Sequence, residues 1–570
     1  MTQPDAFPLP RPAAAVDAGP LDETLYDLVE VRFRRLLATT PLLGTSIGIH
    51  TEDHRLSDGS RDAMLGEIED ERRHLAAIGA IDPAGLSAGA RFERDLEIHN
   101  VRRSLFDAAE IRRWERRSTG MDELGDSIFM LFARDFAPLR DRVDAIASRL
   151  EASPGFLLRS RTRLVRTPVA AWQAQELQAT HNMPFLFQEV ASIAAQPGAG
   201  VPAPERERLD RAIAAADAAL ADHAAWVEGT LANATDDWAV GAEAYDELVA
   251  RRAFDGLDAD QILEIGWEQL RVNREARRAC ARELDPDVEE AAVMARLKDD
   301  HPATFEEALE GYRDVMYRAR AHVVARNIAT VPDDERIEVM PTPVHLRAVM
   351  PFAAYFPTAK FDADQTGVYL VTPSVDGDPR AMREHYRSSI SNTSIHEAYP
   401  GHHLQLTVAA RHPSLTRLLA DAPEFVEGWG MYSEQMMREE GFDDGPAFRL
   451  ALHTDAIWRA CRIILDVRMH RGELTTQEAV DFVVEHTGFE IPNATAEVNR
   501  YTYTPTYQLS YLLGKVLILG LREDEKRRRG ADFSLRAFHD TLLRNGSLPI
   551  SFHRRLFTEA RAQAPGPARS

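Results

Sequence analysis

Cysteine is almost absent from this chain, and long apolar runs and an excess of basic residues are missing altogether. The two cysteines, Cys280 and Cys461, do not form a metal-type pair, so a disulfide framework is excluded and a reducing compartment is expected. No stretch of about 18 uncharged apolar residues occurs, so we expect no membrane span. The net charge of −23, from 90 acidic and 67 basic residues, argues against nucleic-acid binding, which needs a basic surface.

What is present is the composition of an ordinary globular protein. The 570 residues are 44% apolar and 28% charged, which allows a large core and two or three subdomains. The segment from Met1 to Gly19 is rich in Ala, Pro and Asp and lacks the basic-then-apolar pattern of a signal peptide. We therefore expect a cytoplasmic protein.

The most informative segment runs from Ser394 to Gln405, with the sequence Ser-Ile-His-Glu-Ala-Tyr-Pro-Gly-His-His-Leu-Gln. It approaches the zinc-peptidase pattern H-E-x-x-H, in which two His at i and i+4 on one helix bind Zn²⁺ and the Glu acts as general base. Here position i+4 is Pro400, which binds no metal, and the next imidazoles are His402 and His403. The segment is a metal site only if the Pro-Gly break changes the local geometry.

Helix geometry makes that condition explicit. In an unbroken helix, residues i and i+6 differ by about 240° in azimuth and ~9 Å in rise, so His396 and His402 would not share an ion. His403, at i+7, faces nearly the same way as His396 but lies ~10.5 Å along the axis. Because Pro400 has no N–H and clashes with the carbonyl four residues back, we predict a distortion at 399–401. Two looped-out residues would bring His402 into the usual i+4 place, with His403 as the rival ligand. The alternative is an ordinary kinked helix with surface histidines.

A second segment, Phe425-Val426-Glu427-Gly428-Trp429-Gly430, supplies a candidate third ligand. Catalytic zinc commonly has three protein ligands and a water, and an unpaired carboxylate among apolar residues, such as Glu427, is costly to bury. Gly428 and Gly430 are poor helix formers and fit a place where backbones approach closely. The alternative for Glu427 is a solvated or salt-bridged helix residue.

These segments resemble known families. His396-Glu397, Gly401-His402-His403-Leu404 and Phe425-Val426-Glu427 resemble the thimet-oligopeptidase family, with Tyr399-Pro400 as a two-residue insertion. The dipeptidyl-peptidase III family also carries an insertion at this place. The chain is closer to the bacterial domain-of-unknown-function family 885, whose signature is His-Glu-Ala-x-Pro-Gly-His-His-Leu-Gln. This resemblance covers roughly residues 340–550, and more loosely the whole chain. Residues 505–509 depart from it, reading Pro-Thr-Tyr-Gln-Leu for the usual Pro-Gly-Gln-Ala-Leu.

The resemblance implies a mainly α, gluzincin-like metallopeptidase with a short β-sheet before the metal-binding helix and a deep cleft. His396, His402 and Glu427 would hold one Zn²⁺ per chain, and Mn²⁺ or Co²⁺ would also suit such a site. Glu397 would take a proton from the attacking water and pass it to the leaving amine. His403 would orient a ligand or face the cleft.

Further residues are candidates for the oxyanion and for substrate. Tyr511 and His470 match family positions on later helices and are the candidate oxyanion donors. Arg468 and Arg500 would bind a substrate carboxylate through a bidentate fork, unless they form structural pairs with acidic residues. Tyr501 lies in the same region, where core packing is its alternative role. Tyr369 belongs to the run Val368–Thr372, which the resemblance makes an edge strand that pairs with substrate backbone; a buried hairpin is the alternative.

The predicted organisation combines these motifs with helical periodicity. Helical pattern dominates before residue 327, for instance over 205–231 and 260–283, while 336–350 and 366–373 favour strands. The expected parts are a disordered tail (1–20), a helical domain (21–335), a catalytic metallopeptidase domain (336–562) and a second tail (563–570).

Three functions remain open from the sequence. The leading one is a zinc-dependent hydrolase acting on short peptides, as a carboxypeptidase or an oligopeptidase. The second is a metal-dependent amidohydrolase for a specialised metabolite. The third is a non-catalytic helical scaffold with a decayed site, against which the intact His396, Glu397, His402, His403 and Glu427 set argues.

Overall fold

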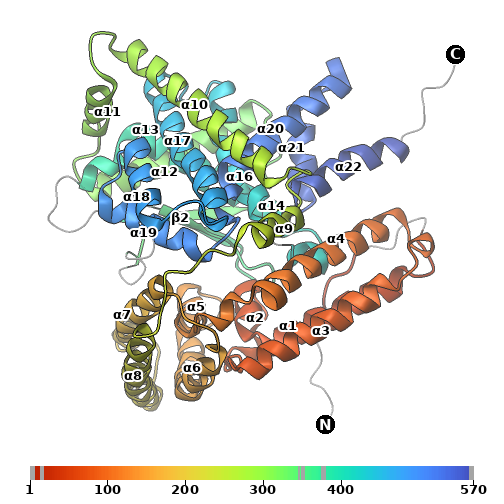
Figure 1. The fold of residues 1–570 in the computed structure, drawn as a ribbon, viewed down its shortest axis with the longest axis vertical. Coiled ribbons are helices and arrows are strands. Elements are labelled where there is room, and N and C mark those ends of the chain that lie inside the picture. Colours follow the sequence, from red (N-terminus) through yellow and green to blue (C-terminus); the bar gives the residue numbers. More distant parts are fainter. Residues whose placement is uncertain are drawn as a thin grey trace. The chain divides into compact units, whose positions relative to one another are not determined.

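The computed structural model describes residues 7–12, 18–343, 347, 353–373, 381–420 and 422–563. Of the two predicted tails, residues 1–6, 13–17 and 564–570 lie outside the described residues. The predicted mainly α fold, with a small sheet ahead of the metal motif, is confirmed (Figure 1). In the part of the chain that the structure describes, no helix is long and apolar enough to cross a membrane.

The chain forms two compact units whose boundary lies at Trp238–Ala239. The first unit holds residues 1–238 and two short later segments, 359–365 and 413–419; the second holds the remainder. The sequence analysis instead separated 21–335 from 336–562. In the structure the helices between 242 and 325 belong to the second unit. Of these, α10 (Ala259–Leu284) packs along α17 (Pro446–His470), and α12 (Phe305–Ala325) packs against α13 (Arg387–Glu397) and β1 (Arg336–Pro341).

The first unit is helical. Its helices are α1 (Asp22–Thr39), α2 (Pro41–Ile47), α3 (Arg61–Gly79), α4 (Ala88–Leu105), α5 (Gly120–Ala133), α6 (Leu139–Ser160), α7 (Ala170–Ala194), α8 (Ala203–Leu231) and the short α15 (Leu415–Leu418). The helical pattern over 205–231 corresponds to α8. One apolar cluster joins α1 to both inserted segments, since Phe361 and Leu415 pack with Leu25 and Phe33.

The second unit contains the sheet and the remaining helices. Its helices are α9 (Ala242–Arg252), α10 (Ala259–Leu284), α11 (Glu290–Asp299), α12 (Phe305–Ala325), α13 (Arg387–Glu397), α14 (His402–Ala409), α16 (Pro423–Glu439), α17 (Pro446–His470), α18 (Thr476–Thr487), α19 (Ile491–Tyr503), α20 (Ser510–Arg529), α21 (Leu535–Arg544) and α22 (Ile550–Gln563). Its core includes Trp429 and Tyr432 of α16, which packs along α20.

The sheet has the order β1-β3-β2, with β1 (Arg336–Pro341) parallel to β3 (Thr366–Val371) and β2 (Ala353–Phe356) antiparallel to it. The prediction that Val368–Thr372 forms an edge strand was wrong, because β3 is hydrogen-bonded on both sides. The strand that takes one edge, β2, was not predicted from the sequence. Tyr355 of β2 lies opposite Tyr369 of β3.

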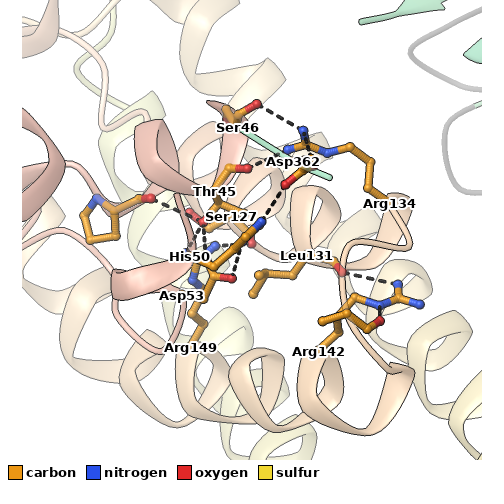
Figure 2. A network of polar contacts seen from close by, with 12 residues as sticks. Thr45, Ser46, His50, Asp53, Ser127, Leu131, Arg134, Arg142, Arg149 and Asp362 are labelled. Carbon is orange, nitrogen blue, oxygen red and sulfur yellow. Dashed lines mark hydrogen bonds and ion pairs between the residues drawn. The ribbon is translucent and has the colours of Figure 1, made fainter. Parts of the chain in front are cut away.

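A polar network in the first unit centres on His50 (Figure 2). Its Nδ1 lies 2.7 Å from Asp53 and its Nε2 2.8 Å from Asp362, while the ring stacks on Phe136 with centroids 3.7 Å apart. Burial lowers the pKa of His50, but hydrogen bonds to Asp362 and Asp53 outweigh it and raise the pKa to about 9. At neutral pH both ring nitrogens therefore donate, and the imidazolium joins the segment 359–365 to the loop after α2.

This network predicts a loss of stability at alkaline pH. The pKa of His50 is raised from ~6.5 in the unfolded chain, so its contribution is complete below pH ~6.5 and is lost as pH rises through about 9. We expect the loss to be about 1–3 kcal/mol by this linkage. In thermal melts between pH 6.5 and 10, His50→Asn should show a flatter decline than the wild type. The exposed His54 provides the control, since His54→Asn should keep the wild-type slope. Parallel curves for wild type and His50→Asn would contradict this account.

Candidate metal centre

The helix that carries the His-Glu motif breaks where the sequence predicted. α13 ends at Glu397 and α14 begins at His402, with a cis peptide bond between Tyr399 and Pro400. The N–H of Gly401 donates to the carbonyl of Ile395 over 3.0 Å, and a Cβ on Gly401 would lie 1.8 Å from the His396 carbonyl oxygen. The chain therefore folds back on the end of α13 through a position that only glycine fits. The predicted distortion at 399–401 is confirmed.

The break brings together the three side chains named as ligands. The rings of His396 and His402 lie 4.6 Å apart and nearly perpendicular. Their Nε2 atoms lie 3.6 Å and 3.5 Å from Oε2 of Glu427 on α16. A tetrahedral ion with bonds of ~2.0–2.1 Å separates its ligand atoms by roughly 3.3–3.4 Å. Two imidazoles and a carboxylate at this spacing fit Zn²⁺, and the three ligand atoms all lie within 4.8 Å of one another.

The charges of these groups suit a cation. Burial raises the pKa of Glu427, but hydrogen bonds and charge from His396 and His402 hold it well below its ordinary value. Glu427 is thus an anion across the physiological range. Gly430, one turn along α16, allows the close approach, because a Cβ there would lie 2.5 Å from Cε1 of His396. This agrees with the prediction that glycines in α16 mark a close contact.

Glu434 orients the first histidine. Its Oε1 lies 2.7 Å from Nδ1 of His396, and its Oε2 accepts a 2.9 Å hydrogen bond from the amide of Asn392. The second N–H of the same amide donates to Asp455 over 2.7 Å. A carboxylate on Nδ1 fixes the proton there and leaves the Nε2 lone pair for a metal. Sequence reasoning missed Glu434, although its i+7 spacing from Glu427 places it on nearly the same face of α16.

Glu397 stands beside the cluster and is not among its three ligands. Its Oε2 accepts a 2.9 Å hydrogen bond from the backbone N–H of Tyr355 in β2. Burial raises the pKa of Glu397, opposed by the nearby His402 and His396 and reinforced by Glu427. The edge strand β2 thus fixes this carboxyl group, and its raised pKa makes it a better proton acceptor than an exposed Glu.

His403 is directed away from the three ligands. It is fully buried, with Nε2 2.7 Å from Glu335 and Nδ1 3.0 Å from the hydroxyl of Tyr355. Burial raises the pKa of Glu335, but hydrogen bonds from His403, Tyr399 and Arg320 lower it to about 2. Because both of its ring nitrogens have partners, His403 fixes Tyr355 of β2, the strand whose backbone N–H bonds Glu397. Of the two candidate histidines, the structure brings His402 to Glu427.

Tyrosines from the segment after α19 lie next to Glu427. The hydroxyl of Tyr507 donates to Oε1 of Glu427 over 3.3 Å, and the ring of Tyr511 packs edge-on to Tyr507 with centroids 6.2 Å apart. The guanidinium of Arg462 lies 4.8 Å from the Tyr511 ring centroid. Burial and the Glu427 charge raise the pKa of Tyr511, so its hydroxyl remains a donor at neutral pH.

The remaining predicted site residues have protein partners. Nε2 of the buried His470 lies 2.9 Å from the Tyr501 carbonyl oxygen, and the Tyr501 hydroxyl donates to Glu497 over 2.6 Å. Arg468 pairs with Glu473 over 3.2 Å, and Arg500 pairs with Glu497 over 3.0 Å. Tyr369 is fully buried, with its hydroxyl 3.5 Å from Ser394. None of these side chains is a member of the three-ligand cluster.

The fold and the site define a class: a mainly α-helical protein with a small mixed sheet and a His-His-Glu cluster at a break between two helices. The model of the family described as "Bacterial protein of unknown function (DUF885)" matches residues 41–556, and the chain belongs to this family.

Solved structures share the fold. A protein from Shewanella oneidensis, described as a putative lipoprotein of unknown function, is 21% identical, with a TM-score of 0.78 over 94% of this chain and 99% of its own. A protein from Colwellia psychrerythraea, described as a putative lipoprotein, is 19% identical, with a TM-score of 0.82 over 95% of this chain and 99% of its own. No curated protein matched the sequence.

Proposed function

We propose that the protein is a zinc-dependent hydrolase that cleaves amide bonds of short peptides in the manner of gluzincin metallopeptidases. The observation that carries this proposal is the convergence of His396, His402 and Glu427, with Nε2 of each histidine 3.5–3.6 Å from Oε2 of Glu427, beside the half-buried carboxyl group of Glu397, which is not a member of the cluster. A non-catalytic scaffold would not require two imidazoles and a carboxylate to converge with a second carboxyl group, that of Glu397, beside them.

Each group of the site has a role in this chemistry. Zinc bound by the three ligands would polarise a scissile carbonyl and make water a better nucleophile at neutral pH. Glu397 accepts the proton of the attacking water and delivers it to the leaving amine. The Tyr511 hydroxyl donates a hydrogen bond to the oxyanion, a role worth ~10²–10³-fold in rate for oxyanion donors in general.

Other residues keep these groups in position. Glu434 holds His396 through Nδ1, and the chain Glu335–His403–Tyr355 holds the strand whose N–H bonds Glu397. The edge strand β2 replaces β3 as the strand that receives the substrate backbone, because among the described residues β2 pairs with β3 alone and its Tyr355 N–H bonds Glu397.

A peptide digest tests this function. Zinc-loaded protein, incubated with a mixture of random hexapeptides and followed by mass spectrometry, should give new fragments. 1,10-Phenanthroline should stop the cleavage and added zinc should restore it. If zinc-loaded protein cleaves no peptide, the peptidase assignment is wrong. Release of amines from non-peptide acyl amides under the same conditions would favour a specialised amidohydrolase.

A further inference from the structure

One lysine of α20 is buried without a partner. Lys515 is 5% exposed, and no hydrogen bond or ion pair joins its ammonium group to another residue in the described part of the chain. Burying a charged amine without a partner is unfavourable, because the ion loses part of its hydration and gains no opposite charge in direct contact. Burial accordingly lowers the pKa of Lys515, with partial compensation from the charges of Glu434 and Glu439. The N–H donors of the Lys515 ammonium group, held in this largely buried position, therefore suit an acceptor supplied by a ligand.

Lys515 belongs to the surroundings of the metal cluster. It follows Tyr511 by one turn of α20, so the two side chains lie on the same side of that helix. Its backbone nitrogen lies 2.9 Å from where a Cβ of Gly428 would be, and Gly428 is next to the ligand Glu427. The charge of Lys515 also lowers the pKa of Glu434, the carboxylate that holds His396.

Arg459 of α17 is a second cation in this region. Its guanidinium lies 3.9 Å from the Trp458 ring centroid and 6.0 Å from that of Tyr511. Its charge, like that of Lys515, lowers the pKa of Glu434. Asp455 is its ion-pair partner at 3.3 Å, and that carboxylate is shared with Asn392. The Nε–H of Arg459 is buried and has no hydrogen-bond partner among the described residues.

Two neighbouring arginines, Arg462 and Arg500, differ from Lys515 and Arg459 because they share the carboxylate of Glu497. Arg462 donates to Glu497 over 2.8 Å and Arg500 pairs with the same carboxylate. Stacking on Trp458 occupies the face of the Arg459 guanidinium, and in-plane N–H groups remain for an acceptor. Among the described residues, the charged donors in this region that lack an acceptor are the ammonium of Lys515 and Nε of Arg459; the uncharged Nε1 of Trp458 also has none.

We propose that Lys515 and Arg459 form a subsite for a substrate carboxylate, so that the preferred substrates are peptides with a free C-terminus. An ammonium and a guanidinium together bind a carboxylate through charge-assisted hydrogen bonds. One helical turn, about 6 Å of rise, separates Lys515 from Tyr511. A peptide residue spans ~3.3–3.6 Å, so cleavage falls one or two residues before the C-terminus. The inference rests on the proposed hydrolase function and replaces Arg468 and Arg500 as the carboxylate-binding residues. Glu473 and Glu497 pair with those two arginines, whereas Lys515 has no acidic partner and Arg459 keeps an unbonded Nε–H beside its contact with Asp455.

The test compares random hexapeptides made as free acids with the same peptides made as C-terminal amides. Wild-type protein should cleave the acids with a kcat/KM about 10–100-fold higher, as expected for a lost charge-assisted contact. Lys515→Met and Arg459→Met should lower kcat/KM for the acids toward the value for the amides, mainly through KM, so that the acid-to-amide ratio falls to about one. Lys526→Met is the matched control, because Lys526 lies on the same helix and pairs with Glu523 on the surface.

Two further measurements separate this role from a structural one. Lys515→Met removes an unpaired buried charge and keeps the side-chain volume, so its melting temperature and zinc content should equal or exceed those of the wild type. If Lys515 served only to balance Glu434, the variant would lose zinc or stability and cleave both peptide forms more slowly, which would overturn the proposal.

The subsite is also measurable without turnover. By calorimetry, zinc-loaded Glu397→Gln protein, which holds the ligand without cleaving it, should bind N-acetyl-Ala-Phe at least tenfold more tightly than N-acetyl-Ala-Phe amide, and adding Lys515→Met should remove the difference. Equal binding of acid and amide by the Glu397→Gln protein would overturn the subsite, even where the wild type hydrolyses peptides. Selective binding of the acid by a protein that cleaves no peptide would instead contradict the proposed hydrolase function and support the subsite.

Discussion

Replacing Glu397 with glutamine should lower the rate of hydrolysis by ~10²–10⁴-fold while the protein keeps its zinc, because the loss of a general base typically has an effect of this size. Glutamine preserves the shape of the side chain and its acceptor for the N–H of Tyr355, so β2 should stay in place. What it removes is the carboxylate that we propose takes the proton from water. The ligand set of His396, His402 and Glu427 is untouched.

The measurement has two parts. Zinc content is determined by inductively coupled plasma analysis of protein purified without chelator, and activity is measured on the peptides that the digest identifies. A Glu397→Gln variant with full activity would refute the assignment of this residue as the base. A variant without zinc would mean that Glu397 is a ligand.

Replacing a metal ligand should instead abolish both zinc binding and activity. We expect about one zinc per wild-type chain, since a His₂Glu set binds one ion. His396→Ala, His402→Ala and Glu427→Gln should each reduce the metal content to near zero and activity below detection. Glu427 is the sharpest case, because Glu427→Gln changes one oxygen to an NH₂ group and removes the anion that faces both imidazoles.

His181→Ala, on the exposed side of α7, controls for loss of an arbitrary histidine and should retain zinc and activity. Thermal melting in the presence of zinc checks that each variant is folded. Wild-type protein that remains metal-free after zinc addition would overturn the metal site as a whole. Zinc retained by Glu427→Gln would remove only Glu427 from the ligand set.

The part of the site that depends on local backbone geometry could be predicted from the sequence. Pro400 and Gly401 indicate a helix break, and that break is what allows His396 and His402 to meet. The contact with Glu427 was predicted from a later motif that places a carboxylate among apolar residues.

The ion-pair partners of charged side chains could not be predicted from the sequence where those partners come from elements far apart in the chain. Arg468 and Arg500 have the chemistry to bind a carboxylate, but the fold gives them Glu473 and Glu497. Lys515 has no acidic partner, and Arg459 has Asp455 but keeps a buried Nε–H without an acceptor among the described residues. The sequence does not show either fact, because both depend on how the helices pack. The only sequence signal is spacing: Lys515 is i+4 from Tyr511, and Arg459 is i+4 from Asp455. The edge strand β2 is four residues long, which is too short for a period-2 pattern to stand out.

The division of the chain into units has a consequence for truncation experiments. Residues 359–365 follow β2, and residues 413–419 follow α14, yet both segments fold with residues 1–238. A chain shortened to 239–570 would leave Asp362 without His50 and Arg417 without Glu93, and would expose Phe361 and Leu415 to water. If such a fragment is inactive, the cause would be the loss of structure in these two segments. Residues 359–365 follow the strand that contains Tyr355, and residues 413–419 follow the helix that contains His402. The parts of this protein cannot be assayed one at a time by cutting the gene at a single place.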